Sequence, residues 1–503
     1  MHKIKVSSKL SIFLVIIFAL TSTAFSQEQI DDIEVIGISP LPGIEIDRNK
    51  VPNASQSLQE IDMNNSTATT IVDLLGEKLT GVTIKDVQNS PFQKNLDYRG
   101  FTAAPLLGES QGLAVYLNGT RINEGFGDTL QWELVPEAAL TNIDLMSANP
   151  VFGLNALGGS LALTTKKGLD YLNTDSSIEN HFEVGGADWV NGNIELGAGT
   201  ENQGLYVAME NSYDGGWRDN SAGDVKRLFV NYGILGDNFD YDFTFMNADS
   251  NLNGNGVSPT ELLKVRRESV FTWPDFTSNK VYLAASNANF YLEDDSAINT
   301  SIYYRRLIRD TMNADELDAE ECAEDNETHA EQMEDDFGTA DEPICGEADG
   351  DNYEVLIDQY GNAISNNDAI RKYGLLNHSS TMTVTWGGSA QYNINTNYLD
   401  KMHNIIVGAS IDKTRTAFHS RGELGQLHNN RTVTNLLNTE GGHITLESIR
   451  EHSGASGGME DDNERGDVGS AQLASKTDYY GIYVNDLFDY DDKTTVTISA
   501  RAN

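Results

Sequence analysis

The segment Gly454–Gly458 reads Gly-Ala-Ser-Gly-Gly and fits the Gly-x-Ser-x-Gly pattern of serine hydrolases, with His452 close to Ser456. A nucleophile of this kind sits on a sharp turn between a strand and a helix. Here both flanks, Glu451–Ser453 and Met459–Asp462, are polar and predict a loop. Because the pattern arises easily in a glycine-rich loop, we expect no catalytic residues. A surface serine hydrolase is kept as an alternative.

Cys322 and Cys345 are the two cysteines of the chain, and 22 residues separate them. No cluster of histidine and cysteine with zinc-binding spacing accompanies them. In the oxidising environment of an exported protein, such a pair is expected to form one disulfide rather than a metal site.

Acidic residues are dense between the two cysteines and on both sides of them. From Asp310 to Asp351 there are 18 acidic residues in 42 positions and no lysine or arginine. Self-repelling charge of this kind predicts a solvated loop. The alternatives are capture of a cationic substrate or binding of calcium, although the spacing differs from that of a helix-loop-helix calcium site. The carboxylates considered for calcium are Glu347, Asp349, Asp351 and Glu354. We expect no bound metal and no cofactor.

The overall charge excludes one class of partner. The 76 acidic and 34 basic residues give a formal charge of -42. Nucleic acid is not expected to bind, because its phosphate backbone requires a basic face. A hydrophobic content of 39% also excludes a bundle of membrane helices, but a membrane barrel remains possible because its strands are only half apolar.

The N-terminus carries an export signal. Three lysines precede the apolar run Ser11–Leu20, and small residues follow at Ala24–Ser26. The run is too short to cross a membrane as a helix. We therefore interpret residues 1–26 as a secretory signal peptide rather than an N-terminal anchor.

From Ser177 onward, polar and apolar residues alternate in many segments. In Phe239–Phe245 every odd position is aromatic and every even position is polar. This period of two indicates a strand with one apolar and one polar face. Eleven strands are predicted near residues 177–185, 189–199, 204–213, 225–235, 238–249, 279–292, 296–308, 379–394, 402–418, 476–490 and 493–503.

The connections between these strands alternate in length. Short turns such as Gly236-Asp237 and Asp491-Asp492 alternate with long polar loops, of which the acidic loop 309–378 is one. This parity is typical of an outer-membrane β-barrel and not of a soluble sandwich, which is the alternative. Apolar positions would then face lipid, and Asp240 and Asp242 would face the lumen.

Residues 27–168 differ from the strand region. Asp73–Leu79 predicts an amphipathic helix, and Leu113–Leu117 enters an Asn118-Gly119 turn, a strong hairpin signal. A compact mixed α/β domain before a barrel can fill the lumen, as expected when a barrel has about 22 strands. We expect a linker over residues 27–50 and a plug domain over 51–168.

Eight segments of this region occur in an order and spacing that resemble those of a known family. The segments are Asp32–Gly37, Leu79–Val82, Tyr98–Phe101, Val115–Gly119, Leu134–Pro136, Ile143–Leu145, Phe152–Gly159 and Leu163–Lys166. They resemble the TonB-dependent outer-membrane receptors. The resemblance implies active import of a scarce nutrient, such as a ferric siderophore or another iron chelate, across the outer membrane of a Gram-negative bacterium. The plug would act as the gate. A passive barrel for adhesion or diffusion is the alternative.

The resemblance also implies a partner, the TonB protein of the inner membrane. A short alternating segment can add a strand to the edge of a partner's sheet, and we expect it to contact TonB unless it is only a flexible tail. Its residues are Asp32, Ile33, Glu34, Val35, Ile36 and Gly37. Arg99 and Arg121 are candidates to bind an anionic chelate, with structural ion pairs as the alternative.

The length of the chain limits the barrel that it can form. A plug and a barrel of about 22 strands at roughly 25 residues each need about 700 residues. The 503 residues supply about 11 strands. Because an open sheet edge is not tolerated in lipid, we expect this chain to be the N-terminal part of a longer barrel.

Overall fold

The computed structural model of the chain describes the greater part of residues 35–503. The described residues are 35–41, 45–51, 54–147, 149–186, 188–254, 256–293, 296–321, 343–347, 353–358, 360, 362–367, 369–436, 445–447, 470–491 and 493–503. The predicted signal peptide, Asp32 to Glu34, Cys322, and the Gly454–Gly458 motif with His452 lie outside them.

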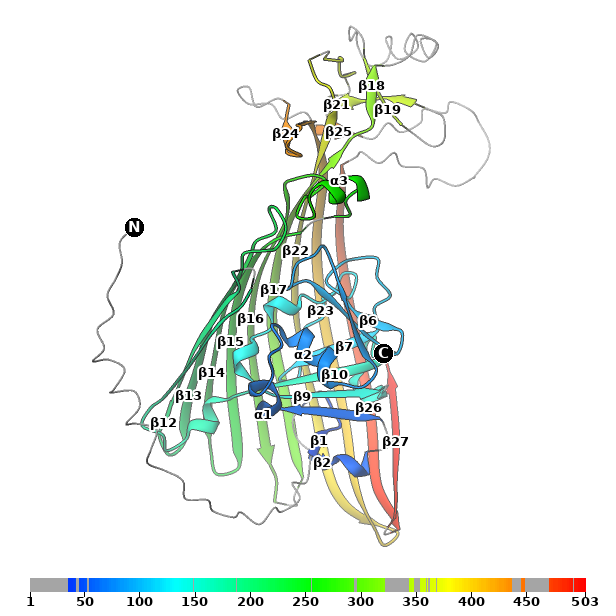
Figure 1. The fold of residues 1–503 in the computed structure, drawn as a ribbon. Coiled ribbons are helices and arrows are strands. Elements are labelled where there is room, and N and C mark those ends of the chain that lie inside the picture. Colours follow the sequence, from blue (N-terminus) through cyan, green and yellow to red (C-terminus); the bar gives the residue numbers. More distant parts are fainter. Residues whose placement is uncertain are drawn as a thin grey trace, which may run out of the picture.

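A large curved antiparallel sheet, which we call the wall, dominates the molecule (Figure 1). Its described part has 14 strands in the order β11-β12-β13-β14-β15-β16-β17-β22-β23-β25-β21, with β24 and β26 also pairing with β23 and β27 pairing with β26. The long strands are β11 (Ser177–Val184), β12 (Val190–Gly199), β13 (Gln203–Asp214), β14 (Gly223–Leu235), β15 (Phe239–Asn253), β16 (Asp275–Tyr291), β17 (Ala297–Glu316), β22 (Tyr373–Tyr398), β23 (Lys401–Leu427), β26 (Ala471–Asp491) and β27 (Thr494–Ala502). Each of these eleven overlaps one predicted range.

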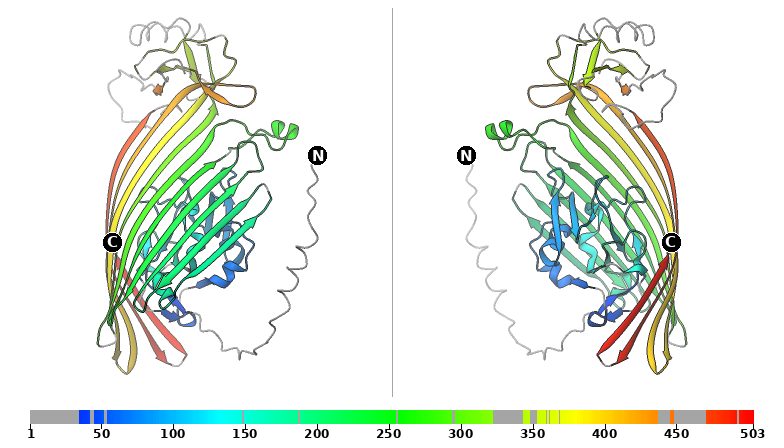
Figure 2. Two further views of the ribbon diagram at one scale, coloured as in Figure 1. Left: turned by 90° about the vertical axis from the view of Figure 1, so that its left-hand side faces the viewer. Right: turned by 90° about the vertical axis from the view of Figure 1, so that its right-hand side faces the viewer.

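The wall does not close on itself. Among the described residues, β11 pairs only with β12 and β27 pairs only with β26. Figure 2 shows the sheet curving around a concave face, like part of a barrel. In the same described part of the chain, none of the helices has the length and apolar character needed to cross a membrane.

The two faces of the wall differ in the predicted way. Asp242 and Thr244 of β15 point to the concave side and are buried, whereas Phe243 between them is exposed on the convex side. The alternation continues through β16, where Asn287 and Asn289 are buried on the concave side and Phe290 is exposed. A polar concave face and an apolar convex face suit a strand between lumen and lipid.

Several strands are longer than predicted, and two of them, β17 and β22, border the expected acidic loop. β17 continues from residue 308 to Glu316, and β22 already begins at Tyr373. Both ends of the expected acidic loop, 309–316 and 373–378, are therefore strand. Residues such as Asp310 and Asp315 carry no apolar alternation, because a strand that leaves the lipid no longer needs an apolar face. The pattern therefore could not mark these ends.

The N-terminal domain, which we call the plug, lies against the concave face of the wall (Figure 2). Its main sheet has the order β3-β9-β10-β7-β8, and a second sheet has the order β4-β5-β6. The strands are β3 (Ser55–Gln59), β4 (Val82–Asp86), β5 (Lys94–Tyr98), β6 (Phe101–Ala103), β7 (Leu113–Leu117), β8 (Thr120–Arg121), β9 (Leu140–Ser147) and β10 (Gly159–Thr165). The helices are α1 (Glu60–Asn64), α2 (Ile71–Lys78) and the 3-10 turns η2 (Trp132–Leu134), η3 (Glu137–Ala139), η4 (Pro150–Phe152) and η5 (Gly168–Tyr171).

Local sequence explains two of these elements. Thr70 caps α2 by accepting a hydrogen bond from the backbone N–H of Asp73 at 3.3 Å. At the predicted hairpin, Asn118 has φ 47° and Gly119 has φ 85°. Both residues of a type I′ turn require positive φ, which asparagine and glycine tolerate best.

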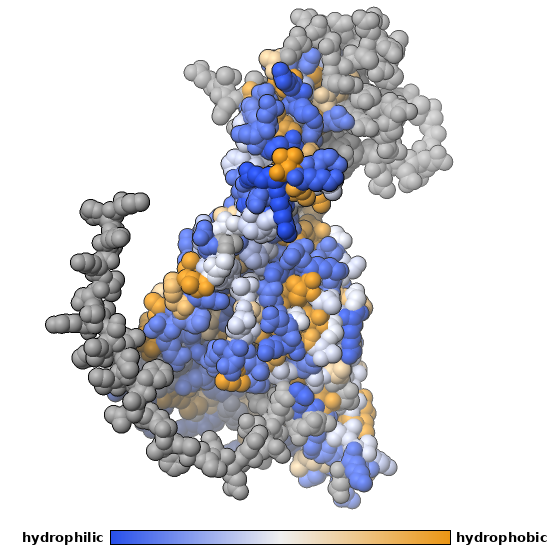
Figure 3. Space-filling view, viewed as in Figure 1, coloured by the Kyte–Doolittle hydropathy of each residue, from blue (hydrophilic) through white to orange (hydrophobic). Residues whose placement is uncertain are grey.

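The plug and the wall share one apolar core. Leu75 of α2 and Leu113 of β7 belong to the same buried cluster as Tyr206, Phe229 and Leu283 of the wall. The side of the plug that faces away from the wall is mostly hydrophilic in Figure 3. The apolar surface of the plug is thus directed inward and toward the wall.

Short elements surround the ends of the wall. At the end that carries the long loops are α3 (Thr260–Val265), β18 (Ala319–Glu321), β19 (Ile344–Glu347), β20 (Tyr353–Val355), β21 (Ile357–Asp358), β24 (Val433–Asn435) and β25 (Thr445–Glu447). At the opposite end, β1 (Val35–Gly37) pairs with β2 (Glu45–Asp47), followed by the 3-10 turn η1 (Arg48–Lys50). We call the first end the outer end.

Candidate functional site

The functional groups of this chain gather where the plug meets the wall. Arg227 of β14 donates from Nη1 to Oε1 of Glu210 at 2.6 Å and from Nε to the backbone oxygen of Glu133 at 2.6 Å. Its Nη2 lies 3.1 Å from Oε1 of Glu137. We call these four residues the Arg227 cluster. The side chains of Arg227 and Glu210 are only 3% and 4% exposed, so removal of one partner would leave a buried charge without compensation.

The two plug carboxylates of the Arg227 cluster have raised pKa values. Burial raises the pKa of Glu133, although Asn279 donates to its Oε1 at 2.8 Å and Ser250 at 3.3 Å. Burial also raises the pKa of Glu137 to about 7, and the nearby Glu210 carboxylate adds to the shift against the opposing charge of Arg227. Glu137 is therefore poised to change charge near neutral pH.

Lys166 forms a second ionic link at the end of β10. Its Nζ lies 2.7 Å from Glu195 of β12, 3.1 Å from Glu60 of α1 and 3.6 Å from Glu179 of β11. Tyr206 donates to the same Glu195 carboxylate at 2.6 Å. Burial opposes the charge on Lys166, but the hydrogen bond and charge of Glu195 outweigh it and raise the lysine pKa.

Strand β17 binds two plug loops near the outer end. Arg305 forms a buried ion pair with Glu124, and Nη1 of Arg309 donates to the backbone oxygen of Pro105 at 2.9 Å. Burial raises the pKa of Glu124. Both arginines point toward the plug, because odd positions of β17 face the concave side.

The chain segment that follows the plug sheet is seated directly on wall backbone. Gly168 of η5 donates its N–H to Oδ1 of Asn231 at 2.7 Å. A Cβ atom on Gly204 of β13 would lie 1.9 Å from the carbonyl oxygen of Gly168. The ring of Tyr171 stacks on that of Tyr206 with centroids 5.5 Å apart. Only a residue without a side chain fits at this contact.

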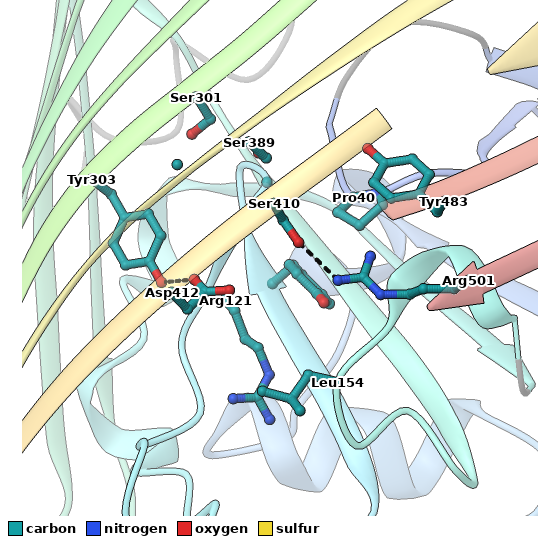
Figure 4. A pocket seen from close by; sticks show the side chains of 13 residues that line it. Pro40, Arg121, Leu154, Ser301, Tyr303, Ser389, Ser410, Asp412, Tyr483 and Arg501 are labelled. Atoms are coloured by element: carbon teal, nitrogen blue, oxygen red, sulfur yellow. Dashed lines mark hydrogen bonds between the residues drawn. The ribbon is translucent and has the colours of Figure 1, made fainter. Parts of the chain in front are cut away.

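A small polar cavity lies between the plug and strands β17, β22, β23, β26 and β27 (Figure 4). In it Tyr303 donates to Asp412, and Arg501 donates from Nη2 to Ser410 at 2.8 Å. The lining residues are Pro40, Tyr116, Gly119, Arg121, Leu154, Ser301, Tyr303, Gly388, Ser389, Ser410, Asp412, Tyr483 and Arg501. Its volume of about 40 Å³ has room for a few water molecules but not for a bulky chelate.

The segment predicted to contact TonB is partly buried. Val35 to Gly37 pair with Asp47 to Glu45. Ile36 is 1% exposed and packs with Tyr116, Met146 and Phe152 of the plug. Ile36 would have to leave this apolar cluster before the segment could be drawn away from the plug.

The structure separates the two candidate arginines. Arg121 of β8 forms a buried ion pair with Asp128 and lines the cavity. Arg99 is exposed in the turn between β5 and β6, has φ 52°, and its guanidinium lies 5.0 Å from the centre of the Tyr98 ring. Arg99 does not line the cavity. A role for either arginine in substrate binding stays a prediction.

The structure describes Cys345, the second of the two cysteines. Among the residues that it describes, the acidic side chains form no metal site. Cys345 is buried in β19 and disulfide-bonded. Cys322 lies outside the described residues, so its pairing with Cys345 stays a prediction. Within the described part of the chain, no group of three histidine, cysteine or acidic residues is arranged to hold a metal ion.

Sequence reasoning did not identify the Arg227 cluster. The available signal was the alternation itself, because Glu210 and Arg227 occupy concave-facing positions of strands whose convex-facing neighbours include Met209 and Leu228. Charged residues at inward positions of neighbouring strands are candidates for contact with whatever fills the lumen.

Comparison with known proteins assigns the inner domain. Residues 47–160 match the family model for the TonB-dependent Receptor Plug Domain. This segment is a TonB-dependent receptor plug domain. The predicted resemblance is thereby confirmed, and the family is one of receptors and not of enzymes. The sequence has no match among curated proteins.

Solved structures of outer-membrane transporters and receptors resemble most of the chain. The ferric citrate transporter FecA in its unliganded form is 14% identical, with a TM-score of 0.57, and the match covers 90% of this chain and 59% of that one. The siderophore receptor PiuA from Acinetobacter baumannii is 13% identical, with a TM-score of 0.56 and coverage of 90% and 57%. The ferripyoverdine receptor of the outer membrane of Pseudomonas aeruginosa is 12% identical, with a TM-score of 0.56 and coverage of 92% and 54%.

These matches support the predicted fold class. The wall has the antiparallel strand order of a barrel receptor with the plug on its concave face, although it is an open sheet. The chain spans between 54% and 59% of the length of these three structures. At such identities the likeness concerns the fold.

Proposed function

We propose that this chain belongs to an outer-membrane receptor that imports an iron chelate, with the plug as a gate opened by TonB. The similar structures are named for ferric citrate, a siderophore and ferripyoverdine, which makes a ferric chelate the substrate class to test first. The cell compartment would be the outer membrane of a Gram-negative bacterium, where lipid would cover the convex face of the wall.

One observation carries the proposal: besides the shared apolar core, three sets of charged groups attach the plug to the concave face. Each of three cations pairs with a carboxylate across the interface. Arg227 and Arg305 of the wall pair with Glu137 and Glu124 of the plug, and Lys166 of the plug pairs with Glu195 of the wall. Water can replace the ionic contacts when the plug is displaced, whereas separation of the shared apolar core would expose apolar surface and oppose the displacement. The cavity beside the plug holds only a few waters, so a bulky chelate would not pass through it unless the plug moved.

Strand addition offers a physical route for the movement. β1 has three residues and pairs only with β2 among the described residues, so little backbone pairing has to be lost when a partner's sheet edge captures it. Force applied to β1 would then act on the plug through the buried Ile36. This use of residues 32–37 for TonB contact is part of the proposal.

The rival function is a passive barrel for adhesion or diffusion. An open pore needs neither a plug nor buried charged contacts that hold it. The experiment that separates the two measures binding and uptake in the same cells. Deletion of Ile33 to Ile36 should leave binding of radiolabelled ferric chelate intact and abolish energy-dependent uptake. Unchanged uptake in the deletion would contradict gating by TonB.

The substrate requires its own test. Growth of a gene-deleted strain on single iron sources, with ferric citrate and a hydroxamate or catecholate siderophore in separate cultures, should show loss of growth on one source. Complementation with the intact gene is the control. Normal growth on every iron source would exclude these iron chelates and direct attention to other bulky nutrients.

A further inference from the structure

Two neighbouring loops at the outer end hold an exposed tryptophan beside two arginines. Trp217 lies in the loop between β13 and β14 and is 48% exposed. The guanidinium carbon of Arg218 lies 5.7 Å from the centre of the Trp217 ring. That of Arg267, from the loop between β15 and β16, lies 5.6 Å from it. We call Trp217, Arg218 and Arg267 the outer aromatic site.

The two loops are fixed to each other by hydrogen bonds. The backbone N–H of Asp219 donates to the backbone oxygen of Glu268 at 2.9 Å. Arg218 donates from Nη2 to Oγ of Ser258 at 2.8 Å and to the backbone oxygen of Ser269 at 2.7 Å. The guanidinium of Arg218 is thereby held in a defined position beside the indole.

The carboxylates nearest to the outer aromatic site are engaged by a different arginine. Arg266 forms an ion pair with Asp219, and its Nε lies 3.8 Å from Oε2 of Glu268. Among the described residues, neither Arg218 nor Arg267 forms an ion pair with a carboxylate. Nε of Arg218 is buried without a hydrogen-bond partner there, and burial lowers the pKa of this arginine. Two positive charges thus lack a counter-charge, in a chain whose formal charge is -42.

This arrangement is unfavourable in the absence of a ligand. The exposed indole leaves a large apolar surface in water, and two cations near one ring repel each other. A ligand that covers the ring and carries negative charge would relieve both costs. A planar aromatic group with anionic oxygens has these properties, because its ring can stack on the indole and its oxygens can accept hydrogen bonds from the guanidinium groups.

The loop that carries Arg267 connects the outer aromatic site with the plug. It begins at Gly254, where a Cβ atom would lie 2.8 Å from the Cβ atom of Gln88 in the plug. It continues through α3, which stands at the outer end on the side of the wall that holds the plug (Figure 1 and Figure 2). A molecule that approaches the plug from the outer end would therefore pass this loop.

We infer that the outer aromatic site binds a catecholate group of an iron chelate. Trp217 would contact the face of the catecholate ring, and Arg218 and Arg267 would contact the anionic oxygens at its edge. The inference rests on the proposed import of an iron chelate and selects among such chelates. Citrate and simple hydroxamates have no aromatic ring to stack on Trp217.

The test measures binding to cells that produce the complete receptor and are kept on ice, so that transport does not contribute. The probes carry radioactive iron and are the ferric complexes of dihydroxybenzoate, an aromatic anion, and of acetohydroxamate, which has no ring. The variants are Trp217→Leu, which removes the aromatic face but keeps an apolar side chain, and Arg267→Gln. The matched control is Lys264→Gln, which removes the same charge from an exposed position of α3 in the same loop. Immunoblotting verifies equal amounts of each protein at the cell surface.

The wild type should bind the dihydroxybenzoate complex more tightly than the acetohydroxamate complex. Trp217→Leu and Arg267→Gln should each weaken binding of the dihydroxybenzoate complex by about five-fold and leave binding of the acetohydroxamate complex unchanged. Trp217→Phe, which keeps a ring, should retain most of the affinity, and the control should behave as the wild type.

Several results would overturn the inference. They are wild-type affinity in both variants, an equal loss for the two complexes, an equal loss in Lys264→Gln, and a wild type that does not prefer the dihydroxybenzoate complex. A wild type that binds neither complex also contradicts the inference. The proposed import is decided separately, by growth on single iron sources and by uptake in the deletion of Ile33 to Ile36.

Discussion

Arg227 of β14 and Glu210 of β13 form a hydrogen-bonded ion pair of 2.6 Å on the concave face of the wall, and both side chains are almost fully buried. The pair lies within the wall, yet its function concerns the plug. Arg227 also reaches the Glu133 backbone and the Glu137 side chain, so one guanidinium joins two strands of the wall to two turns of the plug.

Replacement of Arg227 by methionine should loosen the plug. The substitution keeps much of the volume but leaves Glu210 and Glu137 without a cation, at a cost of about 3–5 kcal/mol. Urea unfolding followed by the fluorescence of Trp132, which is buried in the plug, would report the change. The control is Lys226→Met at the neighbouring, convex-facing position, where the effect should be small. A wild-type unfolding midpoint in Arg227→Met would contradict the role of the cluster.

The attachment of the plug should weaken as the pH rises toward neutrality. Glu137 has a pKa raised from 4.5 to about 7 in the docked state, so between these values the docked plug binds more protons than the unfolded chain. Its stability therefore falls as the pH rises through this window and levels off above it.

Glu137→Gln should remove this pH dependence, because the amide cannot ionise. Hydrogen exchange of plug amides at pH 5 and pH 8 would measure it, and Glu77→Gln, at an exposed position of α2, is the control. Equal pH dependence in Glu137→Gln and the wild type would show that another group is responsible.

Gly204→Ala should unseat η5 from the wall. The new Cβ would meet the Gly168 carbonyl oxygen at 1.9 Å, and overpacking of this kind costs about 1–3 kcal/mol or more when backbone must move. Thermal unfolding would measure the loss. Gly186→Ala is a matched control, because no atom lies within 4 Å of a Cβ at that position. Similar melting temperatures for both variants would contradict the close contact.

Ile36→Ala should free β1. Ile36 is buried among plug side chains, and truncation of a buried isoleucine costs about 2–5 kcal/mol, which a three-residue strand pair is too short to offset. Limited proteolysis at residues 35–41 should become faster without substrate. Ile61→Ala, at an exposed position of α1, is the control and should leave cleavage unchanged. Slow cleavage in Ile36→Ala would mean that other contacts hold the segment.

The sequence predicted the wall well because each strand separates two environments. Phe239–Phe245 alternates strictly since one side meets apolar surroundings and the other meets a polar interior. Beyond residue 308 in β17 the strand continues, with Met312 and Ala314 packed in a small cluster on Leu376, Leu427 and Val433, but the strict aromatic and polar alternation ends before the strand does. The length of a wall strand could therefore be predicted only where its convex and concave faces differ in polarity.

Contacts between the plug and the wall were beyond the reach of sequence patterns. Glu137 and Arg227 are 90 residues apart, and nothing in the spacing of either residue specifies the other. The pattern around Ile36 predicts an extended strand that is available to a partner. Its alternation was real, but period-two patterns do not tell whether the apolar face meets solvent, a partner or the chain's own plug.

The contact between Gly168 and Gly204 determines how a mechanical load would travel through the molecule. The C-terminal end of the plug is fixed by backbone on backbone. Its N-terminal end is held by one short strand pair, by apolar side chains such as Ile36 and Ile38, and by single polar contacts such as the ion pair of Lys50 with Asp489. Tension applied at Gly37 would therefore peel the plug progressively from its N-terminal end, and the wall would keep hold of the other end. The plug would stay attached to the wall at its C-terminal end and would return to its docked position when the tension ceases.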